Sequence, residues 1–138
     1  PLYRHNYATL LCSFRKPAAR HYKIKPQQII QKAIGEYDAA IKLSPKQFEY
    51  AADRAEAFLD LTPFPHAEAI HAWQAAFAIA GTPDERDWAH LQTAIAHYKG
   101  EKWKQVEDSL KRMTGEYHQA LAGQLRRATE AKLEGPKP

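Results

Sequence analysis

The stretch KAIGEYDAAIKLSP, Lys32–Pro45, indicates most directly how this chain folds. Ala33, Tyr37 and Ala40 are spaced by four and then three residues, which places them on one face of a helix, and Pro45 follows where that helix would end. The same spacing recurs as Ala69, Trp73 and Ala76, and again as Val106, Leu110 and Met113. The first members of the three triplets are 36 and then 37 residues apart, a period typical of helical-repeat arrays.

Proline, glycine and apolar spacing divide the rest of the chain into blocks of helical length. Ser44 before Pro45 and Thr82 before Pro83 are predicted helix N-caps, each followed by proline in the first turn. Residues 15–26 are expected to form an unusually long link. The patterns predict an all-α fold with seven helices over residues 2–14, 27–43, 46–60, 67–80, 84–99, 102–113 and 116–133.

The repeated triplet resembles the second helix of the tetratricopeptide repeat (TPR), which carries alanine, an aromatic residue and alanine and closes with proline. Trp88 with Leu91, and Ala55 with Phe58, resemble the first helix of that family. The resemblance is to small TPR domains of the bacterial type. It implies a TPR-like α-solenoid of three antiparallel helix pairs and a C-terminal capping helix. The expected single domain spans residues 1–134, with repeats over 2–45, 46–82 and 83–115, a cap over 116–134 and a tail over 135–138.

Composition excludes several protein classes. The 138 residues suffice for one domain, and the single cysteine, Cys12, excludes an intramolecular disulfide scaffold. No run of 18 apolar residues occurs, so a soluble protein without membrane insertion is expected. The sequence does not identify the cellular compartment. The cytoplasm is slightly favoured, and the alternative is an exported protein whose leader was removed.

Catalytic and metal sites are not expected from the sequence. His90 and His97 lie two turns apart on one predicted helix, too far to ligate one ion unaided. Cys12 has no signature of nucleophilic catalysis and is expected to be a buried, inert thiol. Glycine-rich phosphate loops are absent from the sequence. The chain is therefore predicted to be no enzyme and to need no metal or cofactor, with Trp73 and Trp88 serving the core.

The net charge of +4 is unevenly distributed. Residues 1–35 hold seven basic and no acidic side chains, whereas the remaining residues carry a net charge of −3. The predicted basic patch consists of Arg15, Lys16, Arg20, Lys23, Lys25 and Lys32. Three interpretations stay open: a solvated face, a contact with an acidic neighbouring copy or larger parent chain, and a contact with phosphate on nucleic acid or anionic lipid.

The TPR resemblance also implies a concave groove lined by the first helix of each pair. The groove positions are His5, Asn6, Thr9 and Ser13 in the first repeat, Glu49, Asp53 and Glu56 in the second, and Arg86, His90, Thr93 and His97 in the third. They lie off the apolar stripes and are expected to be free to bind. Because the middle of this groove is acidic, a basic or neutral polypeptide segment is the expected ligand.

These observations predict a non-enzymatic protein interaction module, a scaffold or adaptor that holds a polypeptide segment in its groove. The alternative is a basic helical-repeat module that binds RNA or another polyanion through residues 15–32. A membrane adaptor of the mitochondrial-fission TPR type, considered because of the stretch SPKQFEYA, ranks below both. The identity of the protein partner and the oligomeric state are not predicted.

Overall fold

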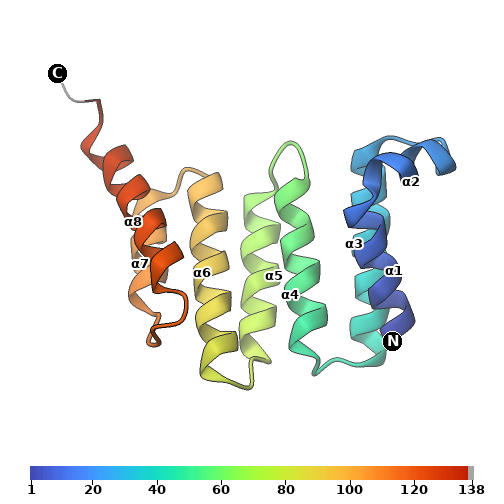
Figure 1. Cartoon of the computed structure of the whole chain (residues 1–138), viewed down its shortest axis with the longest axis horizontal. Coiled ribbons are helices and arrows are strands. Elements are labelled where there is room, and N and C mark those ends of the chain that lie inside the picture. The colour runs from blue at the N-terminus through green and yellow to red at the C-terminus, as the bar shows by residue number, and fades with distance from the viewer. Residues whose placement is uncertain (137–138) are drawn as a thin grey trace.

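The computed structural model of the chain describes residues 1–136, and within that range every regular element is helical. The elements are α1 (Leu2–Ser13), α2 (Arg15–Tyr22), α3 (Pro26–Leu43), α4 (Phe48–Ala57), the 3₁₀ turn η1 (Phe58–Asp60), α5 (His66–Ala78), α6 (Pro83–Lys99), α7 (Trp103–Lys111) and α8 (Gln119–Glu134). The prediction of an all-α fold is confirmed. Figure 1 shows the long helices side by side along the molecule.

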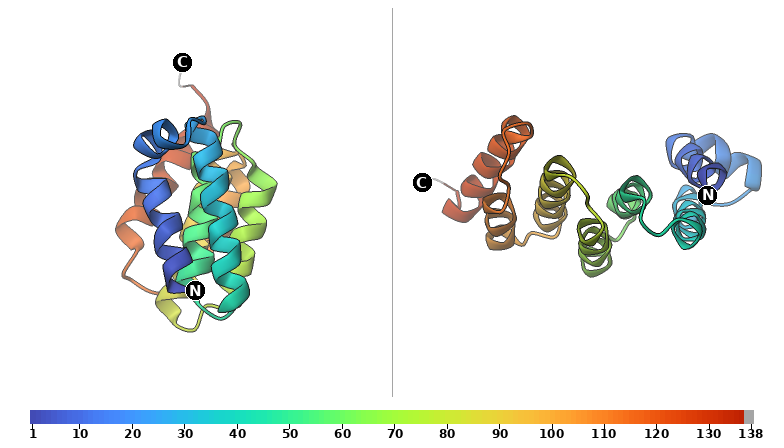
Figure 2. Two further views of the ribbon diagram at one scale, coloured as in Figure 1. Left: turned by 90° about the vertical axis from the view of Figure 1, so that its right-hand side faces the viewer. Right: turned by 90° about the horizontal axis from the view of Figure 1, so that it is seen from below.

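The helices pack in two staggered rows (Figure 2). The first row contains α1, α4, α6 and α8, and the second contains α3, α5 and α7. Each long helix contacts the next one along the chain, and successive helices of the first row also contact one another. Clefts can therefore form at two kinds of place, between neighbouring helices of the first row and between neighbouring helices of the second row.

The core follows the repeated triplets. Ala33, Tyr37 and Ala40 are buried, as are the triplets beginning at Ala69 and Val106. Trp73 is 0% exposed and packs in a cluster between α4, α5 and α6 that is otherwise rich in alanine. The small alanine side chains let the backbones of these helices approach closely. The three helices therefore enclose the large indole of Trp73 completely. The predicted core position of Trp73 is confirmed, whereas Trp88 is only partly buried.

Two local predictions are wrong. The expected long link over residues 15–26 contains the helix α2, which ends where Lys23 adopts the left-handed conformation with φ 56°. Ser44 is the C-cap of α3, not an N-cap, because the next helix starts at Phe48, two residues later than expected. The other N-cap is confirmed, since the Thr82 side chain accepts a hydrogen bond from the Glu85 backbone N–H at 3.1 Å.

None of the helices over residues 1–136 combines the length and the apolar character that a transmembrane span requires.

Candidate functional site

The predicted groove residues of α1 and α4 meet in a cleft of about 180 Å³ between these two helices, called here the α1–α4 cleft. Four predicted residues line it: Thr9, Ser13, Asp53 and Glu56. Sequence reasoning missed the other polar groups of this cleft, which are Cys12, Tyr37 and Asp60. Tyr37 lies on α3 behind the cleft, and its hydroxyl is 3.0 Å from the Thr9 hydroxyl.

The α1–α4 cleft concentrates negative charge. Burial raises the pKa of Asp53 and of Glu56 above the ordinary range for these carboxyls. The charges of Asp53 and Asp60 raise the pKa of Glu56 further. Asp60 pairs with Arg15 at 3.3 Å, whereas no ion pair of Glu56 occurs within residues 1–136. A cationic group entering the cleft would relieve this repulsion.

Cys12 is half-buried at the side of the cleft. Burial raises the pKa of its thiol, and the negative charge of Asp60 adds to that effect. Because the thiolate is the reactive form, this environment disfavours nucleophilic chemistry at Cys12.

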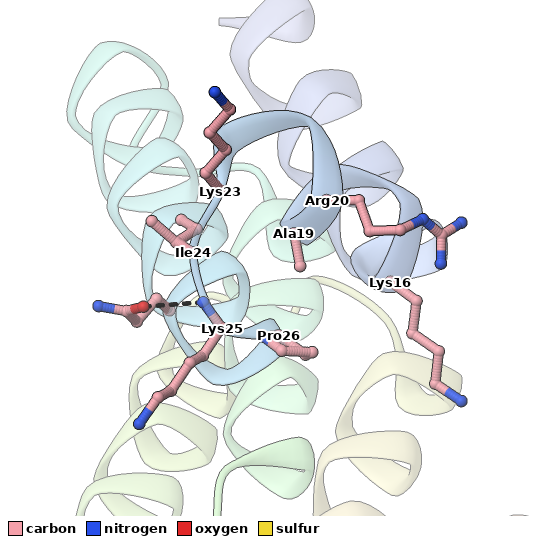
Figure 3. A pocket seen from close by; sticks show the side chains of 8 residues that line it. Lys16, Ala19, Arg20, Lys23, Ile24, Lys25 and Pro26 are labelled. Atoms are coloured by element: carbon pink, nitrogen blue, oxygen red, sulfur yellow. Dashed lines mark hydrogen bonds between the residues drawn. The ribbon is translucent and has the colours of Figure 1, made fainter.

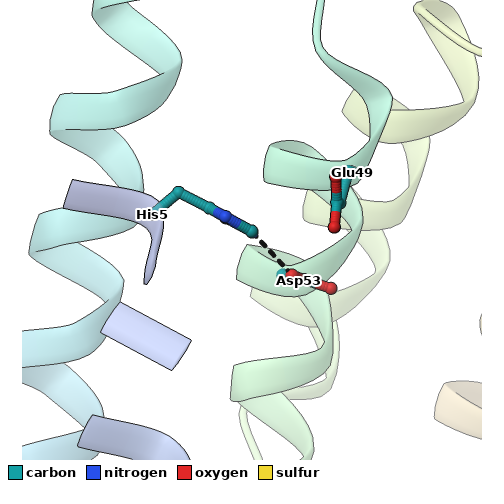
Figure 4. Close-up of side chains that lie close together, drawn as sticks. All are labelled: His5, Glu49 and Asp53. Atoms are coloured by element: carbon teal, nitrogen blue, oxygen red, sulfur yellow. Dashed lines mark hydrogen bonds and ion pairs between the residues drawn. The ribbon is translucent and has the colours of Figure 1, made fainter. Parts of the chain in front are cut away.

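His5 is not free to bind as the groove prediction expected. It is 5% exposed, and its ring stacks on Tyr50 with ring centroids 4.5 Å apart. Its Nε2 lies 2.7 Å from Asp53 Oδ2, a contact that joins α1 to α4 (Figure 4). The physical reason is helical spacing, since His5 precedes the buried Ala8 by three residues and therefore shares its face.

The predicted residues of α6 belong to a different cavity. His90, Thr93 and His97 line a space of about 640 Å³ together with residues of α5 and α7, among them Trp73 and Ser109. Since α5 and α7 are second-row helices, this cavity is separate from the α1–α4 cleft. The exposed Arg86 lines neither space.

The surroundings of the two histidines in this cavity favour their neutral form. Burial lowers the pKa of His90 and of His97. His97 Nδ1 lies 3.0 Å from Nε2 of His66, at the start of α5, and burial lowers the pKa of His66 as well. This pair links two helices rather than presenting two free imidazoles.

The predicted basic patch is gathered only in part. Lys16, Arg20, Lys23 and Lys25 line a shallow space of about 580 Å³ where α2 turns into α3 (Figure 3). Arg15 instead pairs with Asp60, and Lys32 lies over the Tyr22 ring with Nζ 5.4 Å from the ring centroid. Four of the six predicted residues thus share one surface.

Comparison of the chain with protein-family models, with curated proteins and with solved structures gives no match.

Proposed function

We propose that this chain is a TPR-like helical-repeat module that binds a basic segment of another polypeptide at the α1–α4 cleft and catalyses no reaction. The observation that carries the proposal is the set of carboxylates of Asp53, Glu56 and Asp60 around one small cleft. Lysine and arginine side chains form charge-assisted hydrogen bonds with such carboxylates. The TPR part of the proposal is supported by the buried triplets, which recur at a fixed spacing, and by the two-row packing.

The size and the lining of the cleft favour a side chain as the inserted group. About 180 Å³ accommodates one long side chain and excludes a folded domain. The Thr9 and Tyr37 hydroxyls add polar groups beside the carboxylates. A neighbouring stretch of the ligand would lie along α1 and α4, where Asn6 and Glu49 are exposed. The ligand class is therefore an extended segment with at least one lysine or arginine.

A second candidate function is polyanion binding through residues 15–32. The observation in its favour is the shallow space lined by Lys16, Arg20, Lys23 and Lys25. Phosphate groups of RNA would be attracted to these side chains, and such binding weakens steeply as salt rises. The exposed Tyr22, 42% accessible, would offer a ring for base stacking.

Direct binding measurements with two probes test these proposals. The full chain is titrated into a fluorescent 12-residue peptide of alternating arginine and glycine, and separately into a 20-nucleotide polyuridine RNA. The cleft variant combines Glu56→Gln and Asp60→Asn. The matched control combines Glu107→Gln and Asp108→Asn on α7, which removes the same number of charges away from the cleft.

The cleft variant is expected to bind the basic peptide about tenfold or more weakly, because two charge-assisted hydrogen bonds are lost. The control is expected to retain the affinity of the parent chain. Equal weakening in both variants would show that only overall charge matters and would overturn the cleft proposal. Tighter binding of the RNA, lost when Arg20, Lys23 and Lys25 are all replaced by Gln, would instead favour the second candidate.

A further inference from the structure

Three side chains that are distant in the sequence offer metal-binding atoms at one point between α1 and α4. They are His5 on α1 and Glu49 and Asp53 on α4 (Figure 4). One ligand atom from each residue lies within 4.8 Å of the other two. Glu49 and Asp53 are four residues apart on one helix, so both carboxylates extend from the same face.

We propose that His5, Glu49 and Asp53 form a binding site for one divalent transition-metal ion of the zinc class. An imidazole nitrogen with two carboxylate oxygens is a donor set suited to Zn²⁺, whereas Mg²⁺ and Ca²⁺ prefer oxygen ligands alone. Three protein ligands leave a fourth position for water or for a group of a bound partner. The ion would connect the first helix pair to the second.

The histidine is held in place before any ion binds. Its ring lies between Tyr50, with centroids 4.5 Å apart, and Tyr37, with centroids 5.7 Å apart. The side chain is 6% exposed and directs Nε2 toward the carboxylates. A ligand that is already ordered loses little conformational entropy on binding. The exposed Glu49 and the 30% exposed side chain of Asp53 leave a path for the ion from solvent.

The charge around the three residues also favours a cation. Within residues 1–136 the imidazole of His5 is the one basic side chain that contacts the cluster's carboxylates, and it contacts Asp53, so Glu49 has no basic partner there. Glu56 adds a further carboxylate one turn beyond Asp53 on α4. No lysine or arginine of the described chain pairs with any of these acids.

The adjustment needed for binding is small. Ligand atoms around one tetrahedral zinc ion lie roughly 3.3 Å apart, given bonds of about 2.0 Å. His5 Nε2 and Asp53 Oδ2, now 2.7 Å apart, would separate by about half an ångström, and Glu49 would move toward them by a rotamer change. The ring proton would then lie on Nδ1, which has no partner among the described residues. We therefore expect binding about 10- to 100-fold weaker than at a site whose ligating histidine donates a hydrogen bond from its other ring nitrogen.

Titration calorimetry of the chelator-treated full chain with ZnCl₂ tests the proposal. The informative variant is Glu49→Gln, because this side chain is exposed and its loss does not disturb the core. Glu68→Gln is the matched control, an exposed glutamate on α5 that lies between His66 and His71 in the sequence. A parallel nitrogen-detected NMR titration follows the imidazole nitrogens of all seven histidines.

One Zn²⁺ per chain is expected to bind, to shift the ring nitrogens of His5 first, and to bind at least about tenfold more weakly after Glu49→Gln or Asp53→Asn. Glu68→Gln should leave the affinity unchanged, and MgCl₂ should give no binding. The proposal is overturned if Glu49→Gln binds like the parent chain, or if Zn²⁺ shifts His66 and His71 but not His5. The peptide test replaces Glu56 and Asp60, whereas the metal test replaces Glu49 or Asp53. The metal site can therefore fail its test while the proposed function passes, and the reverse also holds.

Discussion

Gly100 and His66 illustrate how closely single residues are fitted in this array. A Cβ atom at Gly100 would lie 2.5 Å from His66 Cδ2 and 2.9 Å from Cγ, far inside normal contact. The φ angle of Gly100 is −85°, so space and not backbone conformation requires glycine there. Gly35, in the middle of α3, differs because its Cβ position has no atom within 4 Å.

We expect Gly100→Ala to lower the free energy of unfolding by about 1 to 3 kcal/mol, because the His66 ring must move. The contact of His66 with His97 should be lost at the same time. Gly35→Ala should instead raise the free energy of unfolding by about 0.5 to 1 kcal/mol through helix propensity. Urea denaturation of both variants measures the two effects, and a neutral Gly100→Ala would contradict the crowding argument.

At the scale of elements, the contact that joins α6 to the segment after α7 depends on one buried carboxylate. Asp87 is 3% exposed. Its Oδ1 accepts a hydrogen bond from the Thr114 backbone N–H at 3.0 Å, and its Oδ2 accepts one from the Gly115 N–H at 2.7 Å. These two bonds hold the turn that leads into α8.

Asp87→Asn is expected to destabilise the protein by about 1.5 to 3 kcal/mol. The amide can accept only one of the two hydrogen bonds, and its NH₂ group then faces a backbone N–H. Asp84→Asn, at an exposed position in the first turn of the same helix, should cost less than about 1 kcal/mol. Thermal unfolding and hydrogen exchange in α8 check this difference, and equal effects of the two variants would contradict it.

At the scale of the whole molecule, stability should depend on pH through half-buried histidines and carboxyls that act in opposite directions. Burial lowers the pKa of His66, His90 and His97 below 6.5, so the unfolded chain binds protons first as pH falls. The raised pKa of Asp53 and Glu56 has the opposite effect, because the folded chain binds these protons first. The contribution of these histidines to the free energy of unfolding is fully present above pH 6.5. It is lost as pH falls through their lowered pKa values in the folded chain.

Replacing both His90 and His97 by Gln should therefore reduce the loss of stability between about pH 7.5 and pH 5.5, a window that spans the ordinary histidine pKa. His21→Gln, an exposed histidine on α2, is the control and should leave the slope unchanged. Urea unfolding at several pH values measures this slope, which is the change in the free energy of unfolding with pH. A steeper slope in the double variant would contradict the assignment.

The helices and the core could largely be predicted from the sequence. The triplets beginning at Ala33, Ala69 and Val106 are all buried, and the predicted helix 84–99 differs from α6 by one residue. These features are local, because the period of the apolar residues defines the buried face of each helix. The α2 helix escaped this reasoning because RKPAARHY has a single buried side chain, Ala19, and so no apolar stripe.

The sites depended on tertiary structure. The TPR resemblance placed His5 and the α6 histidines in one groove, whereas packing buried His5 against Tyr50 and turned His90 toward the α5–α7 side. The pairing of His66 with His97 joins residues 31 positions apart, and the cluster of His5 with Asp53 joins residues 48 apart. Helical periodicity acts within one helix, so the sequence by itself determined the buried face of the helices that carry the repeated triplets. Which helices meet, and therefore which polar groups share a cleft, follows only from how the two rows pack.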